Sequence, residues 1–224
     1  MTGQMITANP ADVKPELSPN AGLVLKSVKW ATFQALMADV GEDRAWRIAY
    51  NQGVLEIRMP LRQHEEPTGL IESFLEALAD ELEIEISKLG ALTLEREDLQ
   101  RAVEPDSCFY IQNEAVIRGK PDINLTIDPP PDLVLESDFT NSSVNKDVIY
   151  SSMGVPELWR YKRDTLLVYH LVDGAYQLQD KSLAFPMLPV AEIPQFIEAS
   201  KTQGQRGAVR LFRQRMRELL NMGD

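Results

Sequence analysis

Apolar and polar residues follow one another along this chain in patterns that predict both helices and strands. A helical spacing of apolar residues begins at Trp30 and stops before Gly41. A longer helical spacing covers about 64–83, with one apolar face and one face rich in glutamate. Two strand-like runs, 46–50 and 54–58, flank an Asn-Gln-Gly connection that is typical of a hairpin. The first part of the chain is therefore predicted to form a helix, a hairpin and a long helix, in that order.

After the long helix the pattern becomes mostly strand-like. Apolar and β-branched runs predict strands near 84–87, 91–95, 107–112, 133–137, 156–162, 165–171 and 174–179. Three further helices are predicted near 143–153, 192–201 and 205–220. Ser142 or Ser143 would cap the first of these helices, and Gly154 would end it. This order of elements predicts an α/β or α+β fold with a mixed central sheet.

Length and composition limit the class of protein. The 224 residues suit one large domain or two small ones. We expect a poorly ordered N-terminal tail over 1–22 and a single domain over 23–224 that ends in C-terminal helices. The single cysteine cannot form an internal disulfide framework, which favours a reducing compartment. Neither a signal-peptide pattern nor an apolar run of about 20 residues occurs, so we expect a cytoplasmic protein without a membrane segment.

The net charge argues against nucleic acid as a long-range partner. The 23 Lys and Arg residues stand against 34 Asp and Glu, which gives a formal net charge of −11. A function on DNA would therefore need a local basic surface. Four arginines near the C-terminus share one stripe of a predicted helix: Arg206, Arg210, Arg213 and Arg217. They would either balance acidic neighbours or a second subunit, or follow the phosphates of DNA.

Two carboxylates stand at the ends of apolar strands. Glu136 follows an apolar run, and Asp106 precedes another. Taken alone, Glu136 could be solvated and Asp106 could cap its own turn. If neighbouring strands bring them together, their hard oxygens suit Mg²⁺ or Mn²⁺, which can activate water and screen charge on a phosphodiester. Lys146, in the helix that follows, could then hold the attacking water or the phosphate.

Five segments, taken in order, resemble the Uma-two family of restriction-endonuclease-like proteins, a branch of the PD-(D/E)xK nuclease fold. The segments lie within about 28–200 and are Met59-Pro60, His64 at the head of the long helix, Glu104-Pro-Asp106, Pro131-Asp-Leu-Val-Leu-Glu136, and Lys146-Asp-Val-Ile-Tyr150 followed by Gly154-Val-Pro-Glu-Leu-Trp159. The resemblance implies a restriction-endonuclease-like α/β core, in which a mixed central β-sheet is flanked by helices.

The same resemblance implies a set of site residues. Asp106 matches the aspartate at the start of the second core strand, and Glu136 matches the glutamate of the third. Lys146 matches a lysine that has moved from the strand to the next helix. These three would be catalytic, and the two carboxylates would bind Mg²⁺ or Mn²⁺.

Further candidates come with a structural alternative or a departure from the family pattern. Asp132 matches a second Pro-Asp or serves as a turn residue, and His64 is a packing residue or a proton carrier. The first long helix offers Glu65 or Glu72. Asp138 stands where the family usually has a lysine; it could ligate a metal but cannot stabilise an anionic phosphate by itself.

These features predict a Mg²⁺- or Mn²⁺-dependent endonuclease that hydrolyses DNA phosphodiester bonds. A homodimer would suit the cutting of two strands. The alternative is an inactive module with a nuclease fold that binds DNA or a regulatory protein partner. The net charge and Asp138 favour this alternative.

Overall fold

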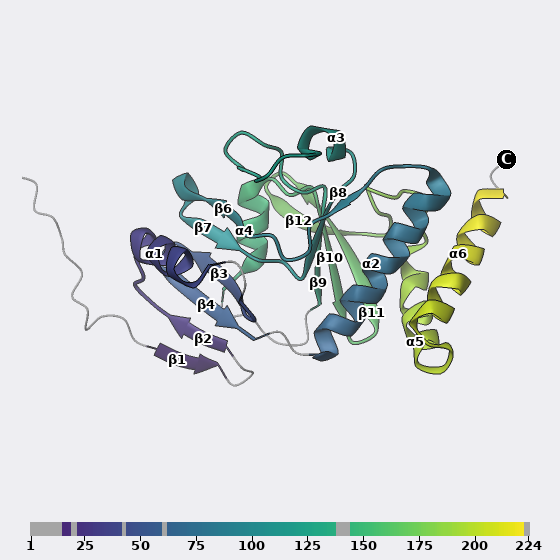
Figure 1. Ribbon diagram of the computed structural model, residues 1–224, viewed down its shortest axis with the longest axis horizontal. Coiled ribbons are helices and arrows are strands. Elements are labelled where there is room, and N and C mark those ends of the chain that lie inside the picture. Colours follow the sequence, from purple (N-terminus) through teal and green to yellow (C-terminus); the bar gives the residue numbers. More distant parts are fainter. Residues whose placement is uncertain (1–14, 19–21, 42–43, 60–61, 138–143, 222–224) are drawn as a thin grey trace, which may run out of the picture.

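The computed structural model describes residues 15–18, 22–41, 44–59, 62–137 and 144–221 (Figure 1). Within these ranges the strands form two six-stranded sheets. The first sheet has the strand order β1 (Pro15–Ser18), β2 (Gly22–Leu25), β4 (Val54–Arg58), β3 (Arg47–Asn51), β7 (Arg101–Val103) and β6 (Leu94–Arg96). The second has the order β12 (Ala175–Gln179), β11 (Thr165–Val172), β10 (Glu157–Lys162), β9 (Leu133–Ser137), β8 (Ser107–Tyr110) and β5 (Ser87–Lys88).

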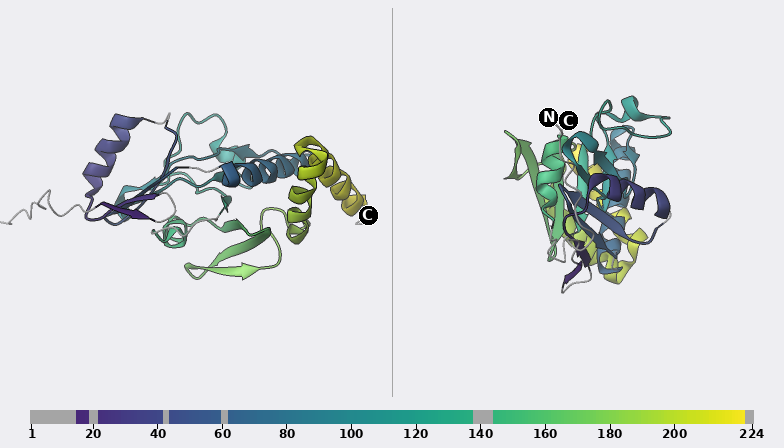
Figure 2. Two further views of the ribbon diagram at one scale, coloured as in Figure 1. Left: turned by 90° about the horizontal axis from the view of Figure 1, so that it is seen from below. Right: turned by 90° about the vertical axis from the view of Figure 1, so that its left-hand side faces the viewer.

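The second sheet is mixed, because β9 and β10 pair in parallel while its other neighbours pair antiparallel. The helices are α1 (Trp30–Val40), α2 (Arg62–Leu82), α3 (Glu114–Ile117), α4 (Lys146–Met153), α5 (Ile193–Gln203) and α6 (Gln205–Asn221). Helix α1 lies at one end of the molecule, and α5 and α6 lie at the other (Figure 2). No helix in the described ranges is long and apolar enough to cross a membrane.

Strand β9 is the centre of the fold because both of its faces are buried. Its odd-numbered residues Leu133 and Leu135 pack in a cluster with α2, which contributes Phe74. Its even-numbered face carries Val134, which packs with Ile149 of α4 in a second cluster. This alternation follows from the period of two along a strand. Glu136 therefore belongs to the face that α4 covers.

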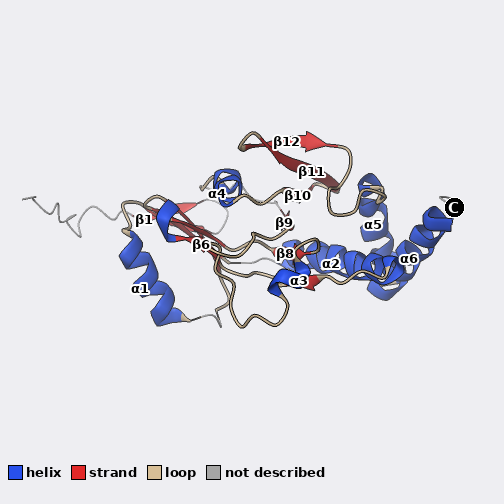
Figure 3. Ribbon diagram, turned by 90° about the horizontal axis from the view of Figure 1, so that it is seen from above, coloured by secondary structure: helices blue, strands red, loops and turns tan. Residues whose placement is uncertain are grey.

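Helix α4 lies between the two sheets (Figure 3). The cluster that contains its Ile149 and Tyr150 also contains Ala49 of β3 and Val103 of β7, which belong to the first sheet. The opposite face of the first sheet packs on α1, where Trp30 and Phe33 contact Tyr50. One face of the first sheet is thus directed toward α4 and the end of β9.

The predicted α/β class with a mixed central sheet flanked by helices is confirmed. The strand periodicity also located the hairpin and β9, but it did not predict that β3 and β4 belong to a separate sheet. Within the predicted tail, residues 15–18 form β1 and pair with β2. Residues 1–14 and 19–21 lie outside the described ranges. The domain boundary at residue 23 stays a prediction.

The predicted N-cap of α4 was wrong. The helix begins at Lys146, and the side chain of Asn145 accepts hydrogen bonds from the backbone N–H groups of Asp147 (3.1 Å) and Val148 (3.4 Å). Ser142 and Ser143 lie outside the described residues. Asn is as good an N-cap as Ser, so the pattern could not distinguish them. The helix ends at Gly154, as predicted, in a left-handed conformation with φ of 78°.

Asn145→Ala should lower the free energy of unfolding by about 1 kcal/mol, because two N–H groups at the start of α4 lose their acceptor. Asn145→Asp, which keeps a capping oxygen, should stay close to the natural protein. Urea unfolding followed by circular dichroism measures both. Equal stability of the Ala variant and the natural protein would contradict the assigned cap.

Candidate active site

The structure brings Asp106 and Glu136 side by side. Ser107 pairs with Leu135 across the antiparallel β8–β9 ladder, so the next position along each strand places Asp106 beside Glu136. The backbone N–H of Ser137 donates to Oδ2 of Asp106 at 2.6 Å, which fixes that carboxylate against the end of β9. Residues thirty positions apart therefore meet because their strands are neighbours.

Lys146 closes this site from the first turn of α4. Its ammonium donates to both carboxylate oxygens of Glu136, at 2.6 Å to Oε1 and 2.7 Å to Oε2. The two side chains are buried, with 4% and 2% of their surface exposed. We expected Lys146 about one turn inside the helix; it is the first helical residue.

Tyr150, one turn further along α4, is a site residue that the sequence analysis missed. Its hydroxyl donates a short hydrogen bond to Oε1 of Glu136. Tyr150 is fully buried. A spacing of four residues places it on the same helix face as Lys146, and this spacing was the signal that could have identified it.

Charges from the first sheet also act on the site. Burial opposes ionisation of Glu136, but Lys146 and Arg58, together with hydrogen bonds from Lys146 and Tyr150, hold the pKa of Glu136 below its ordinary value. Burial of Tyr150 and the charge of Glu136 raise the pKa of the Tyr150 hydroxyl. Tyr150 therefore stays a neutral hydrogen-bond donor at physiological pH.

Asp106 is shifted in the opposite direction. Burial and the neighbouring charge of Glu136 raise the pKa of Asp106 to about 6, against the opposing effects of Lys146, the Ser137 N–H and Arg58. Two carboxylates side by side repel each other when both are ionised. A cation that contacts both would remove this repulsion.

The donor set fits a small, hard divalent cation. Magnesium prefers oxygen ligands, and proteins bind it through one or two carboxylates while it keeps several waters. Asp106 and Glu136 supply such a pair. The described residues contain no group of three or more His, Cys, Asp or Glu side chains that could hold a metal.

Asp132 lies at the other end of β9 and has a local structural role. Its carboxylate accepts from the backbone N–H groups of Ile111 (2.7 Å) and Asn113 (2.9 Å) and from the Asn113 side chain. These bonds hold the turn after β8. Of its two alternatives, the structure supports the turn residue.

The glutamates of α2 have partners of their own. Glu72 pairs with Lys88 of β5 at 3.3 Å, and Glu65 pairs with Arg47 at 3.8 Å. Helix α2 also packs on the face of β9 opposite to α4. The contacts therefore do not join either glutamate to Glu136. Asp138 and the side chain of His64 lie outside what the structure describes.

Two arginines of the C-terminal stripe bind acidic side chains. Arg213 pairs with Asp80 (2.7 Å), and Arg217 forms two bonds with Glu81 (2.7 and 2.9 Å). Phe212 of α6 stacks on Phe74 of α2 with 4.9 Å between ring centroids. For these two arginines the contacts support the balancing of acidic neighbours.

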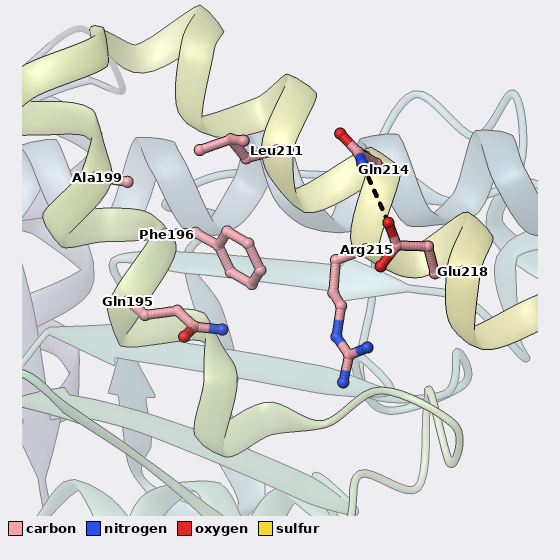
Figure 4. A pocket seen from close by; sticks show the side chains of 7 residues that line it. All are labelled: Gln195, Phe196, Ala199, Leu211, Gln214, Arg215 and Glu218. Atoms are coloured by element: carbon pink, nitrogen blue, oxygen red, sulfur yellow. Dashed lines mark hydrogen bonds between the residues drawn. The ribbon is translucent and has the colours of Figure 1, made fainter.

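A pocket of about 370 Å³ lies elsewhere, between α5 and α6 (Figure 4). Phe196 and Leu211 form its apolar wall, and Arg215 lies at its edge. Arg215 is held by Glu192 through two bonds of 2.8 and 2.9 Å. None of the residues that line this pocket belongs to β8, β9 or α4.

Lys146→Met should lower the free energy of unfolding by about 3–5 kcal/mol, because it leaves the Glu136 carboxylate buried without its main partner. Adding Glu136→Gln should recover part of that loss, since the uncompensated charge is removed. A double-mutant cycle by urea unfolding measures the coupling. Strictly additive effects would contradict a buried pair.

Glu81→Gln tests the contact between α2 and α6 through its pH dependence. Hydrogen bonding by Arg217 lowers the pKa of Glu81 in the folded protein. Its stabilising effect is therefore present above the unfolded pKa and is lost as the pH falls through the folded value. At pH 7 the variant should be less stable by about 0.5–1 kcal/mol, and the difference should shrink progressively as the pH falls below the unfolded pKa of Glu81. Thermal unfolding at pH 7 and at acidic pH measures this, and a gap that does not depend on pH would contradict the ion pair.

Comparisons with known proteins agree with this architecture. The model of the Uma2 (Uma-two) family, described as "Putative restriction endonuclease", matches residues 30–199. Among solved structures, the chain is similar to "a putative nuclease belonging to DUF820 from Anabaena variabilis", with a TM-score of 0.51 and 15% sequence identity. That alignment covers 81% of this chain and 99% of the other, and at this identity it shows a shared fold. No curated protein matches the chain. Because the family match spans well over half of its residues, this chain belongs to the Uma2 family.

Proposed function

We propose that this protein is a Mg²⁺- or Mn²⁺-dependent endonuclease that hydrolyses phosphodiester bonds of DNA. The observation that supports this most is the meeting of Asp106, Glu136 and Lys146 at one end of the central strands. Two carboxylates beside a lysine suit a reaction in which water attacks an anionic phosphate. Membership of the Uma2 family supports the same class of activity.

Asp106 and Glu136 would hold the cation. When bound, a divalent ion lowers the pKa of a coordinated water and screens negative charge on the phosphate. The other roles would belong to residues of this chain. Ser137 orients Asp106 through its backbone N–H, and Tyr150 orients Glu136 through its hydroxyl.

Lys146 would act on the water or the phosphate. Its ammonium has three N–H donors, and two of its contacts are to the oxygens of Glu136. Among the residues that the structure describes, its third donor has no partner and would be able to hold the attacking water or an oxygen of the phosphate. In this way a lysine on α4 would supply the positive charge that the family usually places two residues after the glutamate.

A homodimer belongs to this proposal because two sites related by a two-fold axis can cut both strands of a duplex. Of the four C-terminal arginines, Arg213 and Arg217 would contribute less to DNA binding, since they are paired with acidic side chains. The free charge of that stripe would come from Arg206 and Arg210.

A second candidate function is a nuclease-fold module that binds DNA or a protein without cutting. The hydrogen bonds that Glu136 accepts from Lys146 and Tyr150 favour it, because any metal must compete with them. The net charge of −11 points the same way. Salt-dependent DNA binding without cleavage in Mg²⁺ or Mn²⁺ would support this module.

Nicking of supercoiled plasmid in Mg²⁺ and in Mn²⁺ tests the leading proposal. Asp106→Asn, Glu136→Gln and Lys146→Ala should each slow nicking by about 10²–10³-fold, because the first two remove proposed metal ligands and the third removes a positive charge beside the phosphate. EDTA should abolish it.

Lys201→Ala is the matched control for the lysine, since Lys201 is exposed on α5 and pairs with Glu198. It should nick at the natural rate. Circular dichroism of every variant separates loss of activity from loss of fold. Nicking that survives both carboxylate substitutions would remove the catalytic assignment.

A further inference from the structure

Arg58 is the last residue of β4 and is positioned by a glycine on the neighbouring strand. Gly22 of β2 pairs with Arg58. A Cβ atom at Gly22 would lie 3.3 Å from Cγ of Arg58, which is tighter than an ordinary contact, and 3.5 Å from Oε1 of Glu56, which is an ordinary one. The missing side chain at Gly22 therefore leaves room for the Arg58 stem on this face of the first sheet.

This face is the one directed toward α4. Glu56 and Arg58 are two residues apart on β4 and so share a face. Ala49, opposite Glu56 on β3, packs in the cluster that contains Tyr150. The other face carries Leu55 and packs on α1. Strand alternation therefore directs Arg58 to the side on which Glu136 meets Lys146 and Tyr150.

The electrostatics agree with that placement. Burial opposes the charge of Arg58, but Glu136, Glu56 and Asp106 together raise the pKa of its guanidinium. The effect is mutual, because Arg58 in turn favours the ionised forms of Glu136 and Asp106. Arg58 thus belongs to the electrostatic environment of the candidate active site although it comes from the other sheet.

Arg58 differs from other arginines near α4 and the first sheet in having no direct partner among the residues that the structure describes. Arg44 pairs with Glu104, Arg47 with Glu65 and Arg160 with Asp147. No residue in the described part of the chain forms an ion pair or side-chain hydrogen bond with the Arg58 guanidinium. An arginine whose role was to fix the fold would be expected to use its planar fork on a carboxylate. The fork of Arg58 is available instead.

The charges of the site explain what this fork could bind. Among the residues that the structure describes, three carboxylates (Glu56, Asp106 and Glu136) act on Arg58, and the cations that act on Glu136 are Lys146 and Arg58. Together these groups carry a small net negative charge. A divalent cation bound by Asp106 and Glu136 would make that net charge positive. The group that restores neutrality is a singly charged anion, and a backbone phosphate of DNA carries one negative charge.

We propose that Arg58 is a phosphate-binding residue of this site and that its guanidinium contacts a DNA backbone phosphate next to Asp106 and Glu136. The inference rests on the proposed nuclease function. It assigns the local positive charge that an acidic protein needs to an arginine of the first sheet and not to the stripe on α6. A guanidinium is suited to this role because its fork matches two oxygens of one phosphate.

The test is DNA binding as a function of salt, measured by fluorescence anisotropy with the full chain, a labelled DNA duplex and Ca²⁺ to limit cleavage. Arg58→Gln should raise the Kd about tenfold or more at low salt, as expected for a lost charged hydrogen bond. It should also lower the slope of log affinity against log salt by about 0.9, the value for one phosphate contact. Arg58→Lys, which keeps the charge, should keep the slope.

Arg213→Gln is the matched control, an arginine on α6 that is already paired with Asp80. It should leave the slope unchanged. Equal losses from Arg58→Gln and Arg213→Gln, an unchanged slope in Arg58→Gln, or no DNA binding by the natural protein would each overturn the inference. An Arg58-dependent slope without any nicking would uphold the phosphate contact and reject the nuclease. Nicking by the natural protein, together with a salt slope that Arg58→Gln leaves unchanged, would support the nuclease and reject the phosphate contact.

Discussion

The rest of the site depends on the buried ion pair between Glu136 and Lys146. A carboxylate at the end of a strand that is covered on both faces loses its water, and this loss costs several kcal/mol unless a partner replaces it. Lys146 replaces water on both oxygens, and Tyr150 adds a third hydrogen bond. Both partners come from α4, so the same contacts that keep Glu136 ionised also hold α4 against the central sheet. Because α4 lies between the two sheets, the pair also determines how closely the first sheet, with Arg58, approaches the carboxylates.

The same pair creates a competition that any activity has to resolve. Every hydrogen bond that stabilises ionised Glu136 also occupies an oxygen that a metal would need. Asp106 is in the opposite position, because its pKa is raised by burial and by Glu136 itself, and within the described ranges a backbone N–H holds one of its two oxygens. Asp106 therefore gains more from a cation than Glu136 does. Asp106 and Glu136 would together hold a cation, and Lys146 would then be able to pair with water or with a phosphate oxygen in place of Glu136.

Strand periodicity predicted β9 with its correct ends, and the family resemblance identified Asp106, Glu136 and Lys146, which the structure then placed together. Both methods describe positions along one chain. Neither could show that Arg58 of β4 acts electrostatically on Glu136 of β9, because the two strands belong to separate sheets that pack around α4. Tyr150 could have been predicted, since its spacing of four residues from Lys146 places both on one helix face. The N-cap of α4 could not be predicted, because Ser and Asn are both good N-caps and only the path of the chain selects among Ser142, Ser143 and Asn145. Asp132 is a motif residue for which a turn role was one of two alternatives, and its contacts hold the turn after β8.

The net charge of −11 is a weaker argument against DNA binding than its magnitude suggests. At physiological ionic strength charges separated by more than about 8 Å are largely screened when they are exposed to solvent. Many of the acidic residues are also balanced locally, as Asp80 and Glu81 are by the arginines of α6. What a phosphate at the end of β9 experiences is therefore set by the few charges within that distance and not by the total of −11. Among these charges, Arg58 and Lys146 are positive and partly or fully removed from water, where each interacts more strongly than a surface lysine would. A local site of this kind can bind an anion on a protein whose remote surface repels it, provided that the carboxylates around it are themselves neutralised.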